Sequence, residues 1–141
     1  MPLRKLVSGV TGFVGRHLAY RLLENGHHVI ALARGGKNIS ARDRVIEVLS
    51  EVAGSPDDFK AHLARLQVLE GDIAQPLLGL SQDAFNRAAS EADEIWHCAA
   101  SLSFADEDRD EIFAMNVGGT KKILDLVRQT GHRRLHHVST A

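Results

Sequence analysis

Short apolar runs alternate with longer amphipathic segments along the whole chain. The apolar runs are rich in β-branched residues and predict five strands, at residues 6–8 with their flanks, 28–34, 66–70, 94–98 and 135–139. Apolar residues at helical spacing predict helices between them, at 12–25, 81–91 and 110–129. This alternation is typical of βαβ units. We therefore expect an α/β fold, a Rossmann-like doubly wound parallel sheet of strand order 3-2-1-4-5.

Local signals mark the apolar face and the end of the first helix. Val14, Leu18 and Leu22 recur every four residues and predict its buried face. The helix is expected to end at Asn25-Gly26, since this pair is typical of a C-cap.

Residues 35–65 interrupt the alternation, and their helical part, about 37–65, predicts two helices. Ser40 is suited to cap the first of them, and Gly54 breaks it. Ser55-Pro56 then starts the second with a cap and a first-turn proline. The sequence thus predicts one domain, residues 1–141, with a helical insertion.

Composition narrows the class of protein. The 141 residues are 44% hydrophobic and 25% charged, which excludes a disordered or coiled-coil chain. Seventeen basic and eighteen acidic residues give a net charge of −1, so we expect no nucleic-acid partner. Apolar runs of only a few residues predict no membrane span. The lone Cys98 and the lack of a signal peptide favour the cytoplasm, and the eight histidines lack metal-ligand spacing.

A glycine-rich turn carries the strongest chemical signal. Gly9, Gly12 and Gly15 form G-x-x-G-x-x-G between a predicted strand and a predicted helix. Such glycines allow a tight turn, close approach of the backbone to a pyrophosphate, and close packing of helix on strand. The helix N-terminus then meets the phosphate charge. The motif predicts a dinucleotide site; the alternative is that the glycines only shape a turn.

The end of the second strand indicates which dinucleotide. NAD sites generally carry a carboxylate there for the ribose 2′-OH, whereas NADP sites carry an arginine for the 2′-phosphate. Residues 31–37 contain no carboxylate, and Arg34 and Lys37 are positioned to meet a phosphate. The sequence therefore favours NADP(H), unless Arg34 is merely a solvated strand end.

Six motifs spread over the chain carry a family resemblance. They are Val10-Thr11-Gly12-Phe13-Val14-Gly15, Ala33-Arg34 with the helical insertion after it, Glu70-Gly71-Asp72-Ile73, His97-Cys98-Ala99-Ala100-Ser101, Asn116-Val117-Gly118-Gly119-Thr120 and His137-Val138-Ser139-Thr140-Ala141. With them the chain resembles the N-terminal part of an extended short-chain dehydrogenase/reductase. More narrowly, the combination of these motifs with the helical insertion and the Gly79-Leu80-Ser81 stretch is similar to the thioester-reductase and fatty acyl-CoA reductase branch, the "male sterility" type.

The resemblance implies a set of functional residues. Those implied to bind cofactor are Gly9, Thr11, Gly12, Phe13, Val14, Gly15, Arg34, Lys37, Asp72, Ile73, Ala99, Ala100 and Ser101. Asp72 would accept from the adenine amino group and Ile73 would pack on the adenine ring. Asn116 would help to hold the proton-relay geometry, and Thr140 would bond the substrate carbonyl.

Three of these residues also have a simpler explanation. Asp72 is suited to forming a turn, Asn116 to a solvent-facing helix position, and Thr140 to an ordinary strand end. His97 and Cys98 are expected to be core residues of a buried strand.

The family's Tyr-x-x-x-Lys pair is expected beyond Thr140. The sole tyrosine, Tyr20, lies on the first predicted helix, where it cannot substitute. We therefore expect these 141 residues to be an incomplete domain, ending before the later strands and the substrate-binding part, and to be inactive alone.

The resemblance implies an NADPH-dependent reductase of an acyl thioester on coenzyme A or on an acyl or peptidyl carrier protein. Two alternatives stay open. One is a nucleotide-sugar epimerase, dehydratase or other extended short-chain dehydrogenase, although those usually carry a carboxylate after the second strand. The other is a non-catalytic module that senses NADP. The sequence leaves the acyl group and the oligomeric state unassigned.

Overall fold

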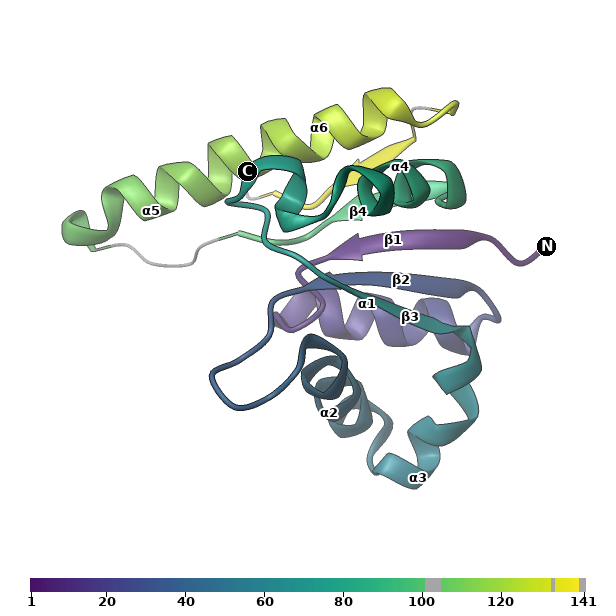
Figure 1. Ribbon diagram of the computed structural model, residues 1–141. Helices are drawn as coiled ribbons and strands as arrows, with labels where there is room; N and C mark the ends of the chain where they lie inside the picture. The colour runs from purple at the N-terminus through teal and green to yellow at the C-terminus, as the bar shows by residue number, and fades with distance from the viewer. Residues whose placement is uncertain (101–104, 133, 140–141) are drawn as a thin grey trace.

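A five-stranded parallel sheet of order β3-β2-β1-β4-β5 forms the centre of the molecule (Figure 1). The computed structural model describes residues 1–100, 105–132 and 134–139. Its strands are β1 (Arg4–Ser8), β2 (His28–Ala33), β3 (Leu66–Glu70), β4 (Glu94–His97) and β5 (Leu135–His137). Its α-helices are α1 (Phe13–Glu24), α2 (Ala41–Ala53), α3 (Pro56–Phe59), α4 (Gln82–Glu91), α5 (Arg109–Phe113) and α6 (Gly119–Gln129). The predicted fold class and strand order are confirmed.

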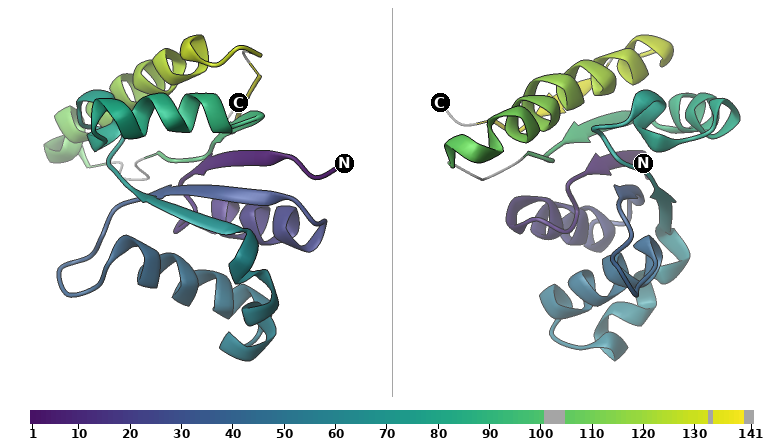
Figure 2. Two further views of the ribbon diagram at one scale, coloured as in Figure 1. Left: turned by 45° about the vertical axis from the view of Figure 1, so that its right-hand side comes forward. Right: turned by 60° about the vertical axis from the view of Figure 1, so that its left-hand side comes forward.

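The sheet is buried on both faces, which is why its strands read as apolar runs rather than as alternating patterns. Figure 2 shows α1 and α2 on one side of the sheet and α4 and α6 on the other. Along β1 the side chains alternate between these layers: Leu6 packs with the α4 and α6 side, and Val7 with the α1 and α2 side. Both are essentially inaccessible to solvent.

Capping residues mark the ends of the helices in the insertion at the predicted positions. The Ser40 hydroxyl accepts from the Asp43 N–H at 3.1 Å and starts α2, which Gly54 ends with φ +103°. Ser55 caps α3 in the same way. The second insertion helix is only one α-turn long, because the chain continues as a 3₁₀ helix over Lys60–Arg65.

Two helix predictions need correction. The buried face of α1 is Gly15, Ala19, Leu22 and Leu23, whereas Val14 is half exposed. Its register follows from the close packing of Gly15 on the turn before the helix, described below.

The helix predicted over 110–129 is not uniform. A π-helical turn, Ala114–Gly118, separates α5 from α6. The Thr120 hydroxyl donates to the Asn116 carbonyl at 2.8 Å, and this side-chain bond competes with the regular backbone ladder. The π turn widens the helix where it approaches the carboxyl ends of the strands.

Three predicted strands are also slightly long, because β2 ends at Ala33, β4 at His97 and β5 at His137. Within residues 1–100, 105–132 and 134–139, no helix combines the length and the apolar character needed to cross a bilayer.

Candidate functional site

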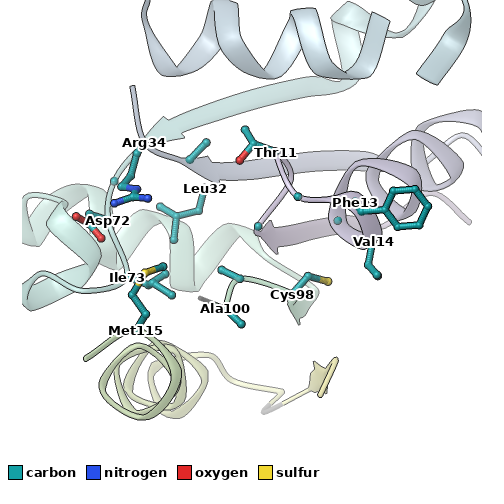
Figure 3. Close-up of a pocket in the computed structure, with 16 residues that line it drawn as sticks. Thr11, Phe13, Val14, Leu32, Arg34, Asp72, Ile73, Cys98, Ala100 and Met115 are labelled. Atoms are coloured by element: carbon teal, nitrogen blue, oxygen red, sulfur yellow. The ribbon is translucent and has the colours of Figure 1, made fainter. Parts of the chain in front are cut away.

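A cleft of about 270 Å³ opens at the carboxyl ends of the strands. Figure 3 shows side chains that converge on it from the turn after β1, the end of β2, the loop after β3, the segment after β4 and the π turn. The lining residues are Gly9, Thr11, Gly12, Phe13, Val14, Gly15, Leu32, Ala33, Arg34, Gly71, Asp72, Ile73, Cys98, Ala99, Ala100 and Met115. The strand order reverses here between β1 and β4, and ligands of doubly wound sheets bind at such a switch point.

The glycines at positions 9 and 15 allow the backbone to close up. Gly9 has φ +77°, and a Cβ built on it would lie 2.6 Å from the Ala99 nitrogen. A Cβ on Gly15 would lie 1.9 Å from the Gly9 carbonyl oxygen. Neither position has room for a side chain, so both glycines are required for the geometry of the turn.

Gly12 differs from its two neighbours in the motif. Its backbone is extended (φ −79°), and a Cβ there would meet only the Gly9 oxygen, at 3.3 Å. The fold tolerates a side chain here better than at the other two glycines, but that side chain would enter the cleft. As the N-cap of α1, Gly12 has no side chain that could accept from the first-turn N–H groups, so these remain available to an anion.

Two guanidinium groups and one carboxylate lie where β2 ends. Arg34 follows β2 directly and lines the cleft (Figure 3). Arg44 of α2, which the sequence reasoning missed, donates from Nη1 to the Arg34 carbonyl at 3.3 Å. Glu70 ends the neighbouring strand, and a Cβ on Gly35 would lie 2.5 Å from its Oε1. Lys37 is exposed and is not among the lining residues.

The loop after β3 forms another wall of the cleft. Asp72 Oδ1 accepts from the Ala74 N–H at 2.9 Å, so the turn-forming role that the sequence allowed is real, although Asp72 also lines the cleft. Ile73 is buried. Figure 3 shows Met115 of the π turn on the same side of the cleft as Ile73. Met115 was missed, because its position depends on a π turn that the apolar pattern does not reveal.

A buried polar network lies below the cleft. Ser8 Oγ and His97 Nδ1 are 2.7 Å apart, and His97 Nε2 is 3.2 Å from Thr120 Oγ1. The Thr120 hydroxyl donates its hydrogen bond to the Asn116 carbonyl, so the Thr120 oxygen accepts from His97 Nε2–H. His97 Nδ1 is then unprotonated and accepts from the Ser8 hydroxyl. Ser8 Oγ in turn accepts from the Ala99 N–H at 3.3 Å.

The electrostatics of this network agree with a neutral imidazole. Burial of the ring, helped by the neighbouring His137, lowers the pKa of His97 to about 4. Burial also raises the pKa of the Cys98 thiol, which does not favour a nucleophilic role. His97 is therefore more than the core residue that the sequence suggested, because it joins β1, β4 and α6 beneath the cleft.

Most of the sequence-predicted site residues thus meet in one cleft, with some exceptions. Asn116 lies in the π turn beside it, half-buried, and its carbonyl accepts from Thr120. Ser101 and Thr140 lie outside the described residues. In the part of the chain that the structure describes, no three His, Cys, Asp or Glu side chains are grouped to hold a metal ion.

Comparison with known proteins adds a family and several relatives. The model of an NAD-binding family described as Male sterility protein matches residues 7–141. The terminal R domain from the myxalamid PKS-NRPS biosynthetic pathway is 32% identical, with a TM-score of 0.86. A thiolation-reductase di-domain from an archaeal non-ribosomal peptide synthetase is 26% identical, with a TM-score of 0.82. The isonitrile lipopeptide synthase of Mycobacterium tuberculosis is 34% identical over 143 residues.

These matches cover nearly all of this chain but only part of each relative. The R domain is matched over 100% of this chain and 35% of its own chain, and the di-domain over 99% and 36%. The synthase is matched over 96% of this chain and 6% of its own length. The chain therefore spans about a third of the two solved relatives and a small part of the synthase.

Proposed function

The chain belongs to the NAD-binding family of male sterility proteins, and from that premise we propose that it forms the NADPH-binding part of a reductase of acyl thioesters. The observation that carries the proposal is one cleft that combines a phosphate turn with a guanidinium at the end of β2. A nicotinamide cofactor bound there would supply a hydride to the carbonyl carbon of the thioester. The residues of this chain hold and orient the cofactor.

The turn suits the pyrophosphate of a dinucleotide. With no room for a Cβ at Gly9 or Gly15, and no side chain at Gly12, backbone N–H groups are the donors nearest to a bound phosphate. Val14 and Phe13 stand at the mouth of the cleft, 52% and 77% exposed, where they would contact the groups beyond the pyrophosphate.

The end of β2 supports NADPH over NADH. Arg34 can form two hydrogen bonds with a 2′-phosphate. Arg44, which donates to the Arg34 carbonyl, adds a second positive charge nearby. Glu70 opposes this preference, because a carboxylate on the neighbouring strand repels a phosphate and is suited to accept from a ribose 2′-OH. Directly at the end of β2, the guanidinium groups of Arg34 and Arg44 outnumber the Glu70 carboxylate, and this favours the phosphate.

The adenine would lie between the loop after β3 and the π turn. Ile73 and Met115 provide apolar surface there, and Asp72 keeps one carboxylate oxygen beyond the one that accepts from Ala74. Ala99 and Ala100 leave the floor of the cleft clear beside β4. In the same proposal, Ser101 contributes to the cofactor site, Asn116 to the proton relay and Thr140 to the substrate carbonyl.

The thioester substrate is proposed from the relatives. One solved relative is a thiolation-reductase di-domain of a peptide synthetase, and another is the terminal R domain of a PKS-NRPS pathway. We therefore favour an acyl or peptidyl group carried by a carrier protein over one carried by coenzyme A.

Calorimetric titration with NADPH and NADH tests the cofactor proposal. Wild type should bind NADPH more tightly, and Arg34→Ala should lose roughly 1.5–3 kcal/mol with NADPH and little with NADH. Arg42→Ala, which removes an exposed arginine of α2, is the matched control and should bind like wild type. Equal affinity of wild type for both cofactors would contradict the proposal.

A preference for NADH would support a second candidate instead. Glu70 beside Gly35 is the observation that favours it, since a carboxylate at this edge serves an NAD-dependent epimerase or dehydrogenase.

A further inference from the structure

Arg16 lies behind the glycine turn, on the first turn of α1, and outside the cleft lining. Its Nη2 donates to the Thr11 carbonyl at 2.5 Å and its Nε to the Gly12 carbonyl at 3.2 Å. Its Nη1 also lies 3.5 Å from Glu51 Oε2 of α2. One side chain therefore contacts the two peptide groups that lead into the helix, and the insertion as well.

These contacts fix the directions of the peptide planes. In a trans peptide the carbonyl and the N–H point opposite ways. The Gly12 carbonyl accepts both from the Arg16 backbone N–H at 3.0 Å and from Arg16 Nε, so the side chain reinforces a direction that keeps the Phe13 N–H pointing out of the helix N-terminus. Holding the Thr11 carbonyl likewise keeps the Gly12 N–H on the Gly9 carbonyl, where the two atoms are 3.0 Å apart.

We infer that Arg16 is a positioning residue for the phosphate-binding turn, an inference that rests on the proposed dinucleotide site. Gly12, unlike Gly9 and Gly15, is not packed tightly against neighbouring backbone, so the peptide groups on either side of it depend on hydrogen bonds for their directions. Arg16 supplies two of these bonds from a charged donor, and such bonds are stronger than neutral ones. It would act on any ligand with a 5′-phosphate or pyrophosphate, whether or not that ligand carries a 2′-phosphate.

The contact with Glu51 contributes little to this role. The Glu51 side chain is 65% exposed, and exposed ion pairs at such distances contribute little to stability. The bonds to the two carbonyl groups are therefore the ones that matter. Glu51→Gln should leave the affinity for cofactor within about twofold of wild type.

The experiment compares matched variants of the full chain. Arg16→Met keeps the aliphatic stem and removes every side-chain donor, whereas Arg16→Lys keeps a charge and a donor. Arg21→Met is the control on the same helix, since the Arg21 guanidinium pairs with Glu24 and Arg21 is not among the residues that line the cleft. Dissociation constants are measured for NADPH, NADH and adenosine 2′-monophosphate, alongside the urea unfolding midpoint.

Arg16→Met should weaken NADPH and NADH by a similar factor, roughly 5- to 20-fold. Adenosine 2′-monophosphate carries nothing for the turn to hold, so its affinity should stay at the wild-type value. Arg16→Lys should recover part of the loss, and Arg21→Met should bind like wild type.

Three outcomes would overturn the inference: unchanged affinity for NADPH in Arg16→Met, an equal loss for adenosine 2′-monophosphate, or an equal loss in Arg21→Met. If Arg16→Met is poorly folded, Arg16→Lys decides the question. Binding of NADPH and NADH by Arg16→Lys as tight as by wild type would equally refute the inference. Failure of wild type to bind either dinucleotide would instead refute the proposed function.

Discussion

Protonation of His97 should make the stability of the fold depend on pH. The ring is 1% exposed, and its pKa of about 4 lies well below the ordinary value of 6.5. Between these two values the unfolded chain binds a proton that the folded chain does not. Stability is therefore complete above about pH 6.5 and falls as the pH drops toward 4.

The magnitude follows from the size of the shift. One pKa unit corresponds to about 1.4 kcal/mol, so the full shift removes about 3 kcal/mol by pH 4 and about 2 kcal/mol by pH 5. His27 acts in the same direction, because burial and the nearby Lys5 lower its pKa. Glu94, which has a lowered pKa despite its burial, begins to contribute only at the acid end of this window.

Urea unfolding at about pH 7.5 and about pH 5 measures this effect. His97→Gln should be less stable at the higher pH, since it disturbs the bonds to Ser8 and Thr120, but its stability should fall less on acidification. His27→Gln is the matched control and should keep most of the dependence. The reasoning would be refuted if His97→Gln lost as much stability between the two pH values as wild type, or if NMR showed the His97 ring titrating near 6.5.

The cleft leads to four more predictions. Gly12→Val should fold but lose dinucleotide binding in a fluorescence titration, whereas Gly15→Ala should be destabilised by about 1–3 kcal/mol in urea, because its Cβ would lie 1.9 Å from the Gly9 oxygen. Glu70→Gln should tighten NADPH about two- to fivefold in calorimetry by removing repulsion at an exposed site; weaker NADPH binding would contradict this. Residues 1–141 alone should not consume NADPH with an acyl thioester. Their sole tyrosine, Tyr20, lies on α1 against His62 and outside the cleft, where it cannot act as the proton donor. Consumption of NADPH in proportion to protein concentration would refute this.

The fold was predictable because its signals are local. Strand order follows from the alternation of elements, and Ser40, Ser55 and Gly54 act at the positions where their side chains or φ angles are needed. The glycine turn was equally predictable from its spacing, because Gly12 and Gly15 approach Gly9 within the turn itself. The packing of Gly9 on Ala99, from a distant part of the chain, is a tertiary contact that the spacing does not reveal.

What the sequence concealed depends on contacts across the sheet. Glu70 reaches Gly35 through the pairing of β3 with β2, so a search along β2 alone finds no carboxylate. Arg44 meets the end of β2 only because α2 folds back on it. His97 finds Ser8 on β1, 89 positions away in the chain. In each case the partner is set by tertiary structure rather than by spacing.

The location of bound nucleotide tests the central claim most directly. Backbone amide shifts of the isotope-labelled chain, followed by NMR during titration with NADP⁺, report which residues meet the ligand. The largest changes are predicted at the glycine turn, Gly9 to Gly15, at Arg34, and at Asp72 and Ala99 on the other walls of the cleft. Changes confined to other surfaces, such as the groove between β3 and α4 that Gln67 and Arg87 line, or no changes at millimolar NADP⁺, would contradict the account.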